Sequence, residues 1–220
     1  VDILSSGCAS LLGSTGLSRK LTSVCWNMNG HRKVSELLII IDEVTPDIVM
    51  LQETKLNVSS KLIFESKFPD YFSMSKVNDD EAEVDDINLD TLSDPGGVSI
   101  MWKKDLNAKV IRVVFNFKSA IGVIFDTGLT RIFFLSIYAP TKGKEEEFSS
   151  HLDNLSAVFE REKGNYDEIV ASGDWNLNSN SCEARIAEME IWCRDHGLVR
   201  QDPPSPTHLH YVHKKWTFLD

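Results

Sequence analysis

Polar residues able to bind a metal ion or a phosphate follow successive apolar segments of this sequence. They are Asn27 and Asn29, Glu53, Tyr138, and Asp174 with Asn176. Carboxylate and amide oxygens form the environment that Mg²⁺ prefers, and amide or phenol groups can hydrogen-bond a phosphate without adding negative charge. If the ends of these segments meet at one rim of a sheet, the sequence predicts hydrolysis of a phosphodiester there.

Each of these segments also has an ordinary structural interpretation. Asn27-Met28-Asn29-Gly30 is typical of a turn, because Asn and Gly tolerate left-handed backbone. The segment around Glu53 is compatible with a helix cap, the one around Tyr138 with a strand end, and the one around Asp174 with an Asx turn. It is their order and spacing together that favour a functional site.

The elements that must position these residues are indicated by apolar periodicity and by turn residues. Strands are predicted over 21–26, 47–52, 71–76, 98–102, 108–117, 122–126, 131–138 and 168–172, and helices over 34–44, 60–67, 145–163 and 182–196. Runs of strands with covering helices predict an α/β sandwich of two packed mixed or antiparallel sheets flanked by helices.

Length and composition indicate one domain. The 220 residues, 42% of them apolar, suffice for one α/β core. Residues 1–20 are expected to be a poorly ordered leader or fragment boundary, and residues 21–220 the domain. Without a long apolar run or an export signal, we expect an intracellular protein with no membrane partner. The four cysteines, at positions 8, 25, 182 and 193, lack metal-site spacing and are expected to be reduced thiols.

Negative charge is concentrated in one segment. Residues 77–95 contain eight carboxylates and no Lys or Arg, so they account for most of the net charge of −10 and leave −2 for the rest of the chain. We expect this acidic loop to be mobile and to point away from a substrate groove. A mildly acidic remainder gives only weak support for tight duplex binding, and composition alone leaves the partner open.

Five segments together resemble one family. They are Cys25-Trp26-Asn27-Met28-Asn29-Gly30, the string from Pro46 to Lys55, the string from Gly96 to Trp102, Ser136-Ile137-Tyr138-Ala139-Pro140, and Ser172-Gly173-Asp174-Trp175-Asn176. In this order they resemble the endonuclease/exonuclease/phosphatase superfamily, most closely the endonuclease domains of LINE-type non-LTR retrotransposons. The resemblance implies a DNase I-like four-layer α/β sandwich, a Mg²⁺ or Mn²⁺ cofactor, DNA as substrate, nuclear action, and a reverse transcriptase domain downstream.

The resemblance also implies roles for the site residues. Glu53 is the principal metal ligand, with Asn29, or alternatively Asn27, completing the metal side. Asp174 orients or deprotonates the attacking water, and Asn176 and Tyr138 hold the scissile phosphate.

Near the end of the chain, the match to the family is incomplete. Asp220 resembles the aspartate that orients a catalytic histidine, and Thr207 resembles a threonine near the substrate groove. The resemblance places that histidine in a Ser-Asp-His segment beyond Asp220. The sequence therefore predicts a domain truncated at its C-terminus, which we expect to nick DNA barely or not at all.

Three other functions remain open from the sequence. An abasic-site repair endonuclease and a phosphoinositide phosphatase share the family's metal site and differ in loops that one sequence does not decode. A non-catalytic truncated domain, which keeps the fold and binds nucleic acid or protein, is the third.

Overall fold

Two four-stranded sheets form the centre of the protein. The computed structural model describes residues 21–76, 96–117, 119–177, 183–200, 208–210 and 215–217. In spatial order the first sheet contains β1 (Ser23–Asn27), β2 (Ile48–Gln52), β4 (Val98–Lys103) and β3 (Tyr71–Lys76). The second contains β5 (Lys109–Phe117), β6 (Ala120–Asp126), β7 (Arg131–Tyr138) and β8 (Glu168–Asp174). A separate two-stranded ribbon pairs β9 (His208–His210) with β10 (Lys215–Thr217).

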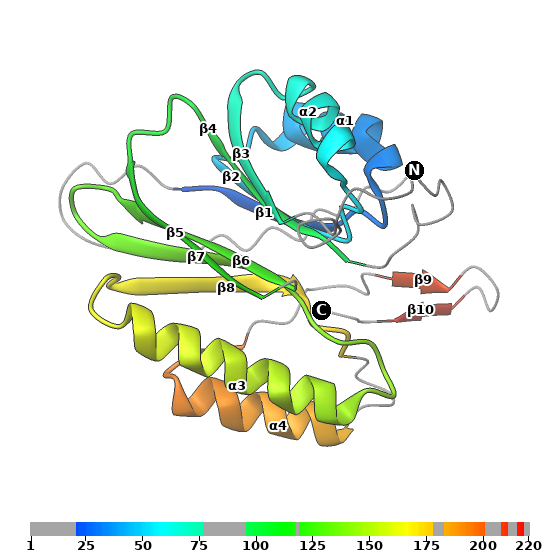
Figure 1. Ribbon diagram of the computed structural model, residues 1–220, viewed down its shortest axis with the longest axis vertical. Helices are drawn as coiled ribbons and strands as arrows, with labels where there is room; N and C mark the ends of the chain where they lie inside the picture. Colours follow the sequence, from blue (N-terminus) through cyan, green and yellow to red (C-terminus); the bar gives the residue numbers. More distant parts are fainter. Residues whose placement is uncertain are drawn as a thin grey trace.

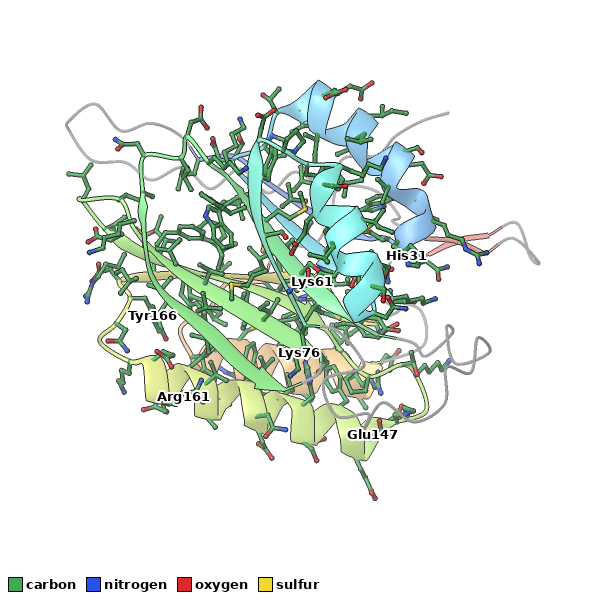
Figure 2. The ribbon with its side chains drawn as sticks, turned by 45° about the horizontal axis from the view of Figure 1, so that its top comes forward. His31, Lys61, Lys76, Glu147, Arg161 and Tyr166 are labelled. Atoms are coloured by element: carbon green, nitrogen blue, oxygen red, sulfur yellow. The ribbon has the colours of Figure 1, made fainter. Side chains whose placement is uncertain are left out.

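Helices cover the outer face of each sheet. The short η1 (His31–Lys33) leads into α1 (Val34–Val44), which lies with α2 (Val58–Ser66) on the first sheet, and α3 (Glu145–Glu162) and α4 (Glu183–Asp195) lie on the second (Figure 1). Figure 2 shows Glu147 and Arg161 along α3, on the side of the molecule opposite α1 and α2. The predicted α/β sandwich is therefore confirmed, with four layers.

The apolar core is divided among the three interfaces between these layers. Between the sheets, Ile48 and Met50 of β2 lie in one buried cluster with Val123 and Phe125 of β6. A second cluster joins α1 and α2 to the first sheet, and a third joins α3 and α4 to the second. Because both faces of each sheet are buried, the strands read as nearly continuous apolar runs, and polar side chains gather at the strand ends.

Each sheet contains one parallel pair of strands, and these two pairs decide where the strand ends lie. β1 is parallel to β2, which places Asn27 opposite Gln52, and β7 is parallel to β8, which places Tyr138 opposite Asp174. The carboxyl ends of parallel neighbours meet at the same edge of a sheet. Each sheet therefore brings two of the polar segments together.

Some predicted boundaries were wrong by a few residues. The strand predicted to end at Ser172 continues as β8 to Asp174, because Gly173 and Asp174 still pair with β7. The helix predicted from Ser60 begins at Val58, because Asn57 and Ser60 form a reciprocal capping box. No strand was predicted beyond residue 172, and the C-terminal region contains the β9–β10 ribbon.

Several expectations fall on residues outside the described ranges, namely the leader 1–20, the acidic loop 77–95, Cys8 and Cys182. Cys25 and Cys193 are present as thiols and not as disulfides, and the Cys25 thiol lies 3.5 Å from Gln52 Oε1. In the part of the chain that the structure describes, no helix combines the length and apolar content needed to cross a bilayer.

The buried His151 of α3 makes stability depend on pH. Its Nδ1 lies 3.2 Å from Ser119 Oγ, and burial lowers its pKa from 6.5 to about 4. Below pH 6.5 the imidazole becomes protonated in the unfolded chain but stays neutral in the folded protein, so this contribution to stability is lost as the pH falls from about 6.5 towards 4.

The pH dependence of stability should therefore weaken in His151→Gln. Between pH 7 and pH 5 the free energy of unfolding, measured in urea, should fall by about 1–2 kcal/mol less in this variant than in the unmodified protein.

Leu152→Ala, which removes a buried side chain without a titratable group from the same helix, provides the matched control. It should lower the free energy of unfolding by the same amount at both pH values. An unchanged pH dependence in His151→Gln would contradict the assignment of a neutral buried imidazole.

Candidate active site

The side-chain amide of Asn27 joins the two sheets at their common rim. Its Nδ2 donates to Glu53 Oε1 at 2.9 Å and to Asp174 Oδ2 at 2.6 Å, and its Oδ1 accepts from the backbone N–H of Asn29 at 2.9 Å. Glu53 follows β2 of the first sheet, whereas Asp174 ends β8 of the second. A single amide group therefore holds two carboxylates, 121 positions apart in the sequence, beside each other.

A buried polar contact directly behind the carboxylates fixes the two sheets relative to each other. Gln52 Nε2 donates to Ser136 Oγ at 2.9 Å, and Ser136 Oγ donates to the carbonyl of Leu51 at 3.2 Å. Breaking one partner of a buried hydrogen bond leaves a desolvated polar group at a cost of about 1–3 kcal/mol. This contact therefore resists sliding of β2 along β7, which would separate Glu53 from Asp174.

Asp174 and Asn176 are fixed by the segment that follows β7. The backbone N–H of Asn176 donates to Asp174 Oδ1 at 2.9 Å, and Asn176 Nδ2 donates to the carbonyl of Ala139 at 2.7 Å. Ala139 in turn donates its N–H to the carbonyl of Asp174 at 2.8 Å. Both oxygens of the Asp174 carboxylate accept hydrogen bonds, so its orientation is set before any substrate binds.

The phenol of Tyr138 lies among these groups. Burial raises its pKa well above the usual value, and the negative charges of Glu53 and Asp174 raise the pKa further. A hydrogen bond to Glu53 also raises the pKa, whereas a hydrogen bond with Asn176 lowers it. The phenol therefore stays protonated at neutral pH and is available as a hydrogen-bond donor.

The backbone carrying these groups is left-handed at several residues other than glycine. Asn29, Glu53, Lys55 and Asn176 have φ angles of 47°, 47°, 48° and 51°. Asn adopts this region readily, but for Glu and Lys it costs about 1–2 kcal/mol per residue. Such strain persists where surrounding contacts impose it, and it is concentrated here at the rim.

Two glycines impose the backbone conformation around Glu53. The N–H groups of Thr54 and Lys55 donate to the carbonyls of Gly97 and Gly96, each at 3.1 Å. Gly97 has φ +85°, and a Cβ built on it would lie 2.7 Å from Thr54 Oγ1. Only glycine at position 97 lets the two segments approach closely enough for these hydrogen bonds.

We expect Gly97→Ala to displace the Glu53 segment. The added methyl group both opposes the positive φ and overlaps Thr54, so the free energy of unfolding should fall by about 2–4 kcal/mol in urea denaturation. Gly164→Ala is the matched control, because Gly164 has φ +86° and open space around its Cβ position. In Gly164→Ala the free energy of unfolding should fall by only about 1 kcal/mol, the cost of a positive φ at alanine. Equal losses in the two variants would mean that the contact with Thr54 is unimportant.

A cation occupies the outer side of this cluster. The ammonium of Lys55 donates to Asn29 Oδ1 at 2.7 Å and lies 3.3 Å from Glu53 Oε2. Asn29 Oδ1 and Glu53 Oε2, from separate segments, thus both contact the Lys55 ammonium, as two ligands contact a metal ion. Within the described ranges no three His, Cys, Asp or Glu side chains gather as a metal site. A divalent ion here would therefore rely on Glu53, an Asn amide oxygen and water, a donor set that suits Mg²⁺.

We expect Lys55 to compete with a divalent ion for these oxygens. Lys55→Met keeps the length of the side chain but removes its charge, so affinity for Mn²⁺, measured by isothermal titration calorimetry, should rise about tenfold, equivalent to about 1.4 kcal/mol. Lys61→Met, on the exposed side of α2, should leave the affinity unchanged. Weaker Mn²⁺ binding by Lys55→Met would show that the ammonium supports the ion and does not compete with it.

The structure brings six of the predicted site residues together and leaves two undescribed. Asn27, Asn29, Glu53, Tyr138, Asp174 and Asn176 lie in the connected cluster. Asp220 and Thr207 lie outside the described residues. No role for Lys55 or Gly97 was predicted from the motifs in which they stand. Their roles depend on contacts of Lys55 with Asn29 and of Gly97 with Thr54, between segments about 25 and 45 residues apart.

The sequence matches the profile of one known protein family. The profile of the endonuclease/exonuclease/phosphatase family matches residues 24–211, which include the whole cluster. The chain belongs to this family. Family members are hydrolytic nucleases and phosphatases, and the family resemblance predicted from the five motifs is confirmed. The comparison with curated protein sequences gives no significant match.

Solved structures confirm the DNase I-like fold. The endonuclease domain of TRAS1, a telomere-specific non-LTR retrotransposon, superposes with a TM-score of 0.63 at 16% identity, over 90% of this chain and 81% of that one. The human nocturnin catalytic domain with a bound sulfate gives 0.58 at 14% identity, over 90% and 80%. D. rerio TDP2 with a single-strand DNA product gives 0.54 at 16% identity, over 77% of this chain and 64% of that one. The chain thus spans less than two thirds of that TDP2 structure.

Proposed function

We propose that this member of the family is a divalent-metal-dependent phosphodiesterase that nicks DNA. The observation that carries the proposal is the Asn27 amide shared by Glu53 and Asp174, because it sets a metal-binding carboxylate and a carboxylate that can act as a base side by side. Tyr138 and Asn176 border the same pair and supply neutral hydrogen-bond donors. Two carboxylates with neutral donors suit attack of water on a phosphodiester.

Asp174 is the group that acts on the attacking water. It is 4% exposed, and hydrogen bonds from Asn27 and from the Asn176 backbone hold its two oxygens. A carboxylate held in a fixed orientation can orient a water molecule and accept its proton as the bond to phosphorus forms. Asn27 restrains this carboxylate from the side facing Glu53.

Glu53 and Asn29 would hold the metal ion, with the Lys55 ammonium moving aside. When bound, a divalent ion supplies charge stabilisation at the phosphate oxygens. On substrate binding, the protonated Tyr138 phenol would turn its O–H from Glu53 to the phosphate, where the second N–H of the Asn176 amide would also donate. Neither donor adds negative charge near the reacting phosphate.

DNA as the substrate is supported by two structural neighbours. The D. rerio TDP2 structure contains a single-strand DNA product, and the TRAS1 structure is a retrotransposon endonuclease domain. The five sequence motifs resemble LINE-type endonucleases most, so we propose a retrotransposon-type nicking enzyme that acts in the nucleus beside a reverse transcriptase domain. Repair of abasic sites and removal of phosphate from phosphoinositides are the competing activities that the assay must separate.

A plasmid-nicking assay tests the proposal. Supercoiled plasmid is incubated with the protein in Mg²⁺ and in EDTA, and conversion to open circles is followed on a gel. In a form extended past Asp220 through the Ser-Asp-His segment that the family resemblance predicts, we expect Mg²⁺-dependent nicking that falls by a factor of about 10²–10⁴ in Glu53→Gln and in Asp174→Asn, since each loses a group that the chemistry requires. Asp153→Asn, at an exposed carboxylate of α3, serves as the matched control.

The 220-residue chain runs in the same assay, and it should nick DNA barely or not at all. Abasic duplex and a phosphoinositide run in parallel. Cleavage confined to the abasic duplex, or phosphate release from the lipid alone, would replace the proposed nicking activity. Nicking that survives both substitutions in Glu53 and Asp174 would refute the site.

A further inference from the structure

Arg185, in the first turn of α4, is buried to an unusual degree for an arginine. Its side chain is 2% exposed, and its guanidinium lies over the ring of Phe148 at 4.7 Å from the ring centroid. Arginine is almost never fully buried unless its charge is compensated. The position therefore requires an explanation from the groups around it.

The compensation comes mainly from backbone carbonyls. Arg185 Nη1 donates to the carbonyl of Pro140 at 2.9 Å, and Nη2 donates to the carbonyl of Thr141 at 3.0 Å. The nearest carboxylate is that of Glu145, which lies 3.6 Å from Nη2 and is itself largely exposed. The arrangement lacks the paired geometry of a buried Arg–carboxylate bridge. The guanidinium is instead directed at one stretch of backbone.

This placement is unfavourable in two ways for α4 itself. A cation in the first turn of a helix opposes the helix dipole, which favours negative charge there. In addition, Arg185 Nε is buried and has no hydrogen-bond partner among the residues that the structure describes, and an unsatisfied buried donor on a charged group is destabilising. Packing of α4 on the second sheet would be served better by an apolar side chain. The benefit of Arg185 must lie in what it holds.

The segment that Arg185 holds leads directly to the reacting groups. Pro140 and Thr141 follow Ala139, and Ala139 bonds to Asp174 through its N–H and to Asn176 through its carbonyl. Displacing the Pro140 carbonyl would shift the peptide that accepts the Asn176 amide. Residues 141–147 are otherwise exposed, so no apolar packing from that stretch fixes this part of the loop.

We infer that Arg185 is a positioning residue for Asn176, one of the two proposed hydrogen-bond donors to the phosphate. It clamps the Pro140 and Thr141 carbonyls from α4 and thereby fixes the Ala139 carbonyl that orients the Asn176 amide. The catalytic part of this inference rests on the proposed function. The geometric part does not, because it concerns the position of Asn176 with or without substrate.

Nuclear magnetic resonance of the Asn176 side chain tests the geometric part. Arg185→Met retains an unbranched side chain of similar length and removes the charge and its donors. We expect the Asn176 side-chain N–H₂ signals, assigned by comparison with Asn176→Asp, to shift or broaden in Arg185→Met. Arg185→Lys restores the charge and one donor, and should return the signals part of the way to those of the unmodified protein.

Two control variants separate positioning from general loss of stability. Met189→Ala removes a buried side chain from the same helix and should lower the unfolding temperature without moving the Asn176 signals. Arg194→Met, on the exposed side of α4, should change neither. If Arg185→Met shifts the Asn176 signals no more than Met189→Ala of similar stability, Arg185 is only a structural residue and the inference is wrong.

A double-mutant cycle in the extended form tests the catalytic part by the nicking assay over a range of plasmid concentrations. Arg185→Met should lower kcat about tenfold with little change in KM, because it disturbs groups that act on the reacting phosphate. In an Asn176→Ala background the same substitution should lower kcat less than twofold, since its target is already absent. A full tenfold loss in both backgrounds would contradict action through Asn176. Absence of nicking by the extended form would refute the proposed function and leave the magnetic resonance result to decide the role of Arg185.

Discussion

The site depends on a single amide group that reaches across the two sheets. Asn27 donates to a carboxylate from each sheet, and without it Glu53 and Asp174 would be two like charges at short range. Like charges so close repel each other unless a donor or a cation lies between them. The Asn27 amide lies between the two carboxylates, and the Lys55 ammonium lies on the other side of Glu53, so both reduce this repulsion.

The layers behind the rim make this contact possible. One parallel pair in each sheet directs two polar segments to the same edge, and three apolar interfaces prevent the sheets from rotating against each other. The buried Gln52–Ser136 hydrogen bond then fixes the register between β2 and β7. Apolar burial supplies most of the stability, while a few buried polar contacts select one alignment. The reacting groups therefore need little rearrangement before substrate binds.

Much of the architecture could be predicted from the sequence because its signals are local. Apolar periodicity gave α1, β3 and β7 with their observed ends, and six residues of the site followed from polar positions after apolar runs together with the family motifs. The boundary of β8 was missed because Gly173 and Asp174 look like a turn, although pairing with β7 keeps them extended. The contacts of Arg185 with the Pro140 and Thr141 carbonyls were also invisible, since recognition of a carbonyl by an arginine leaves no pattern in the residue it binds.

The left-handed backbone of Glu53 sets folding and chemistry against each other at one position. Glycine would adopt a φ of 47° without strain, but it has no carboxylate. Selection for heat resistance alone would therefore favour glycine or asparagine at this position, and the resulting proteins would be more robust and inert. Relatives that carry such a residue beside an otherwise intact core would be recognisable as descendants that kept the scaffold after the need for hydrolysis had disappeared.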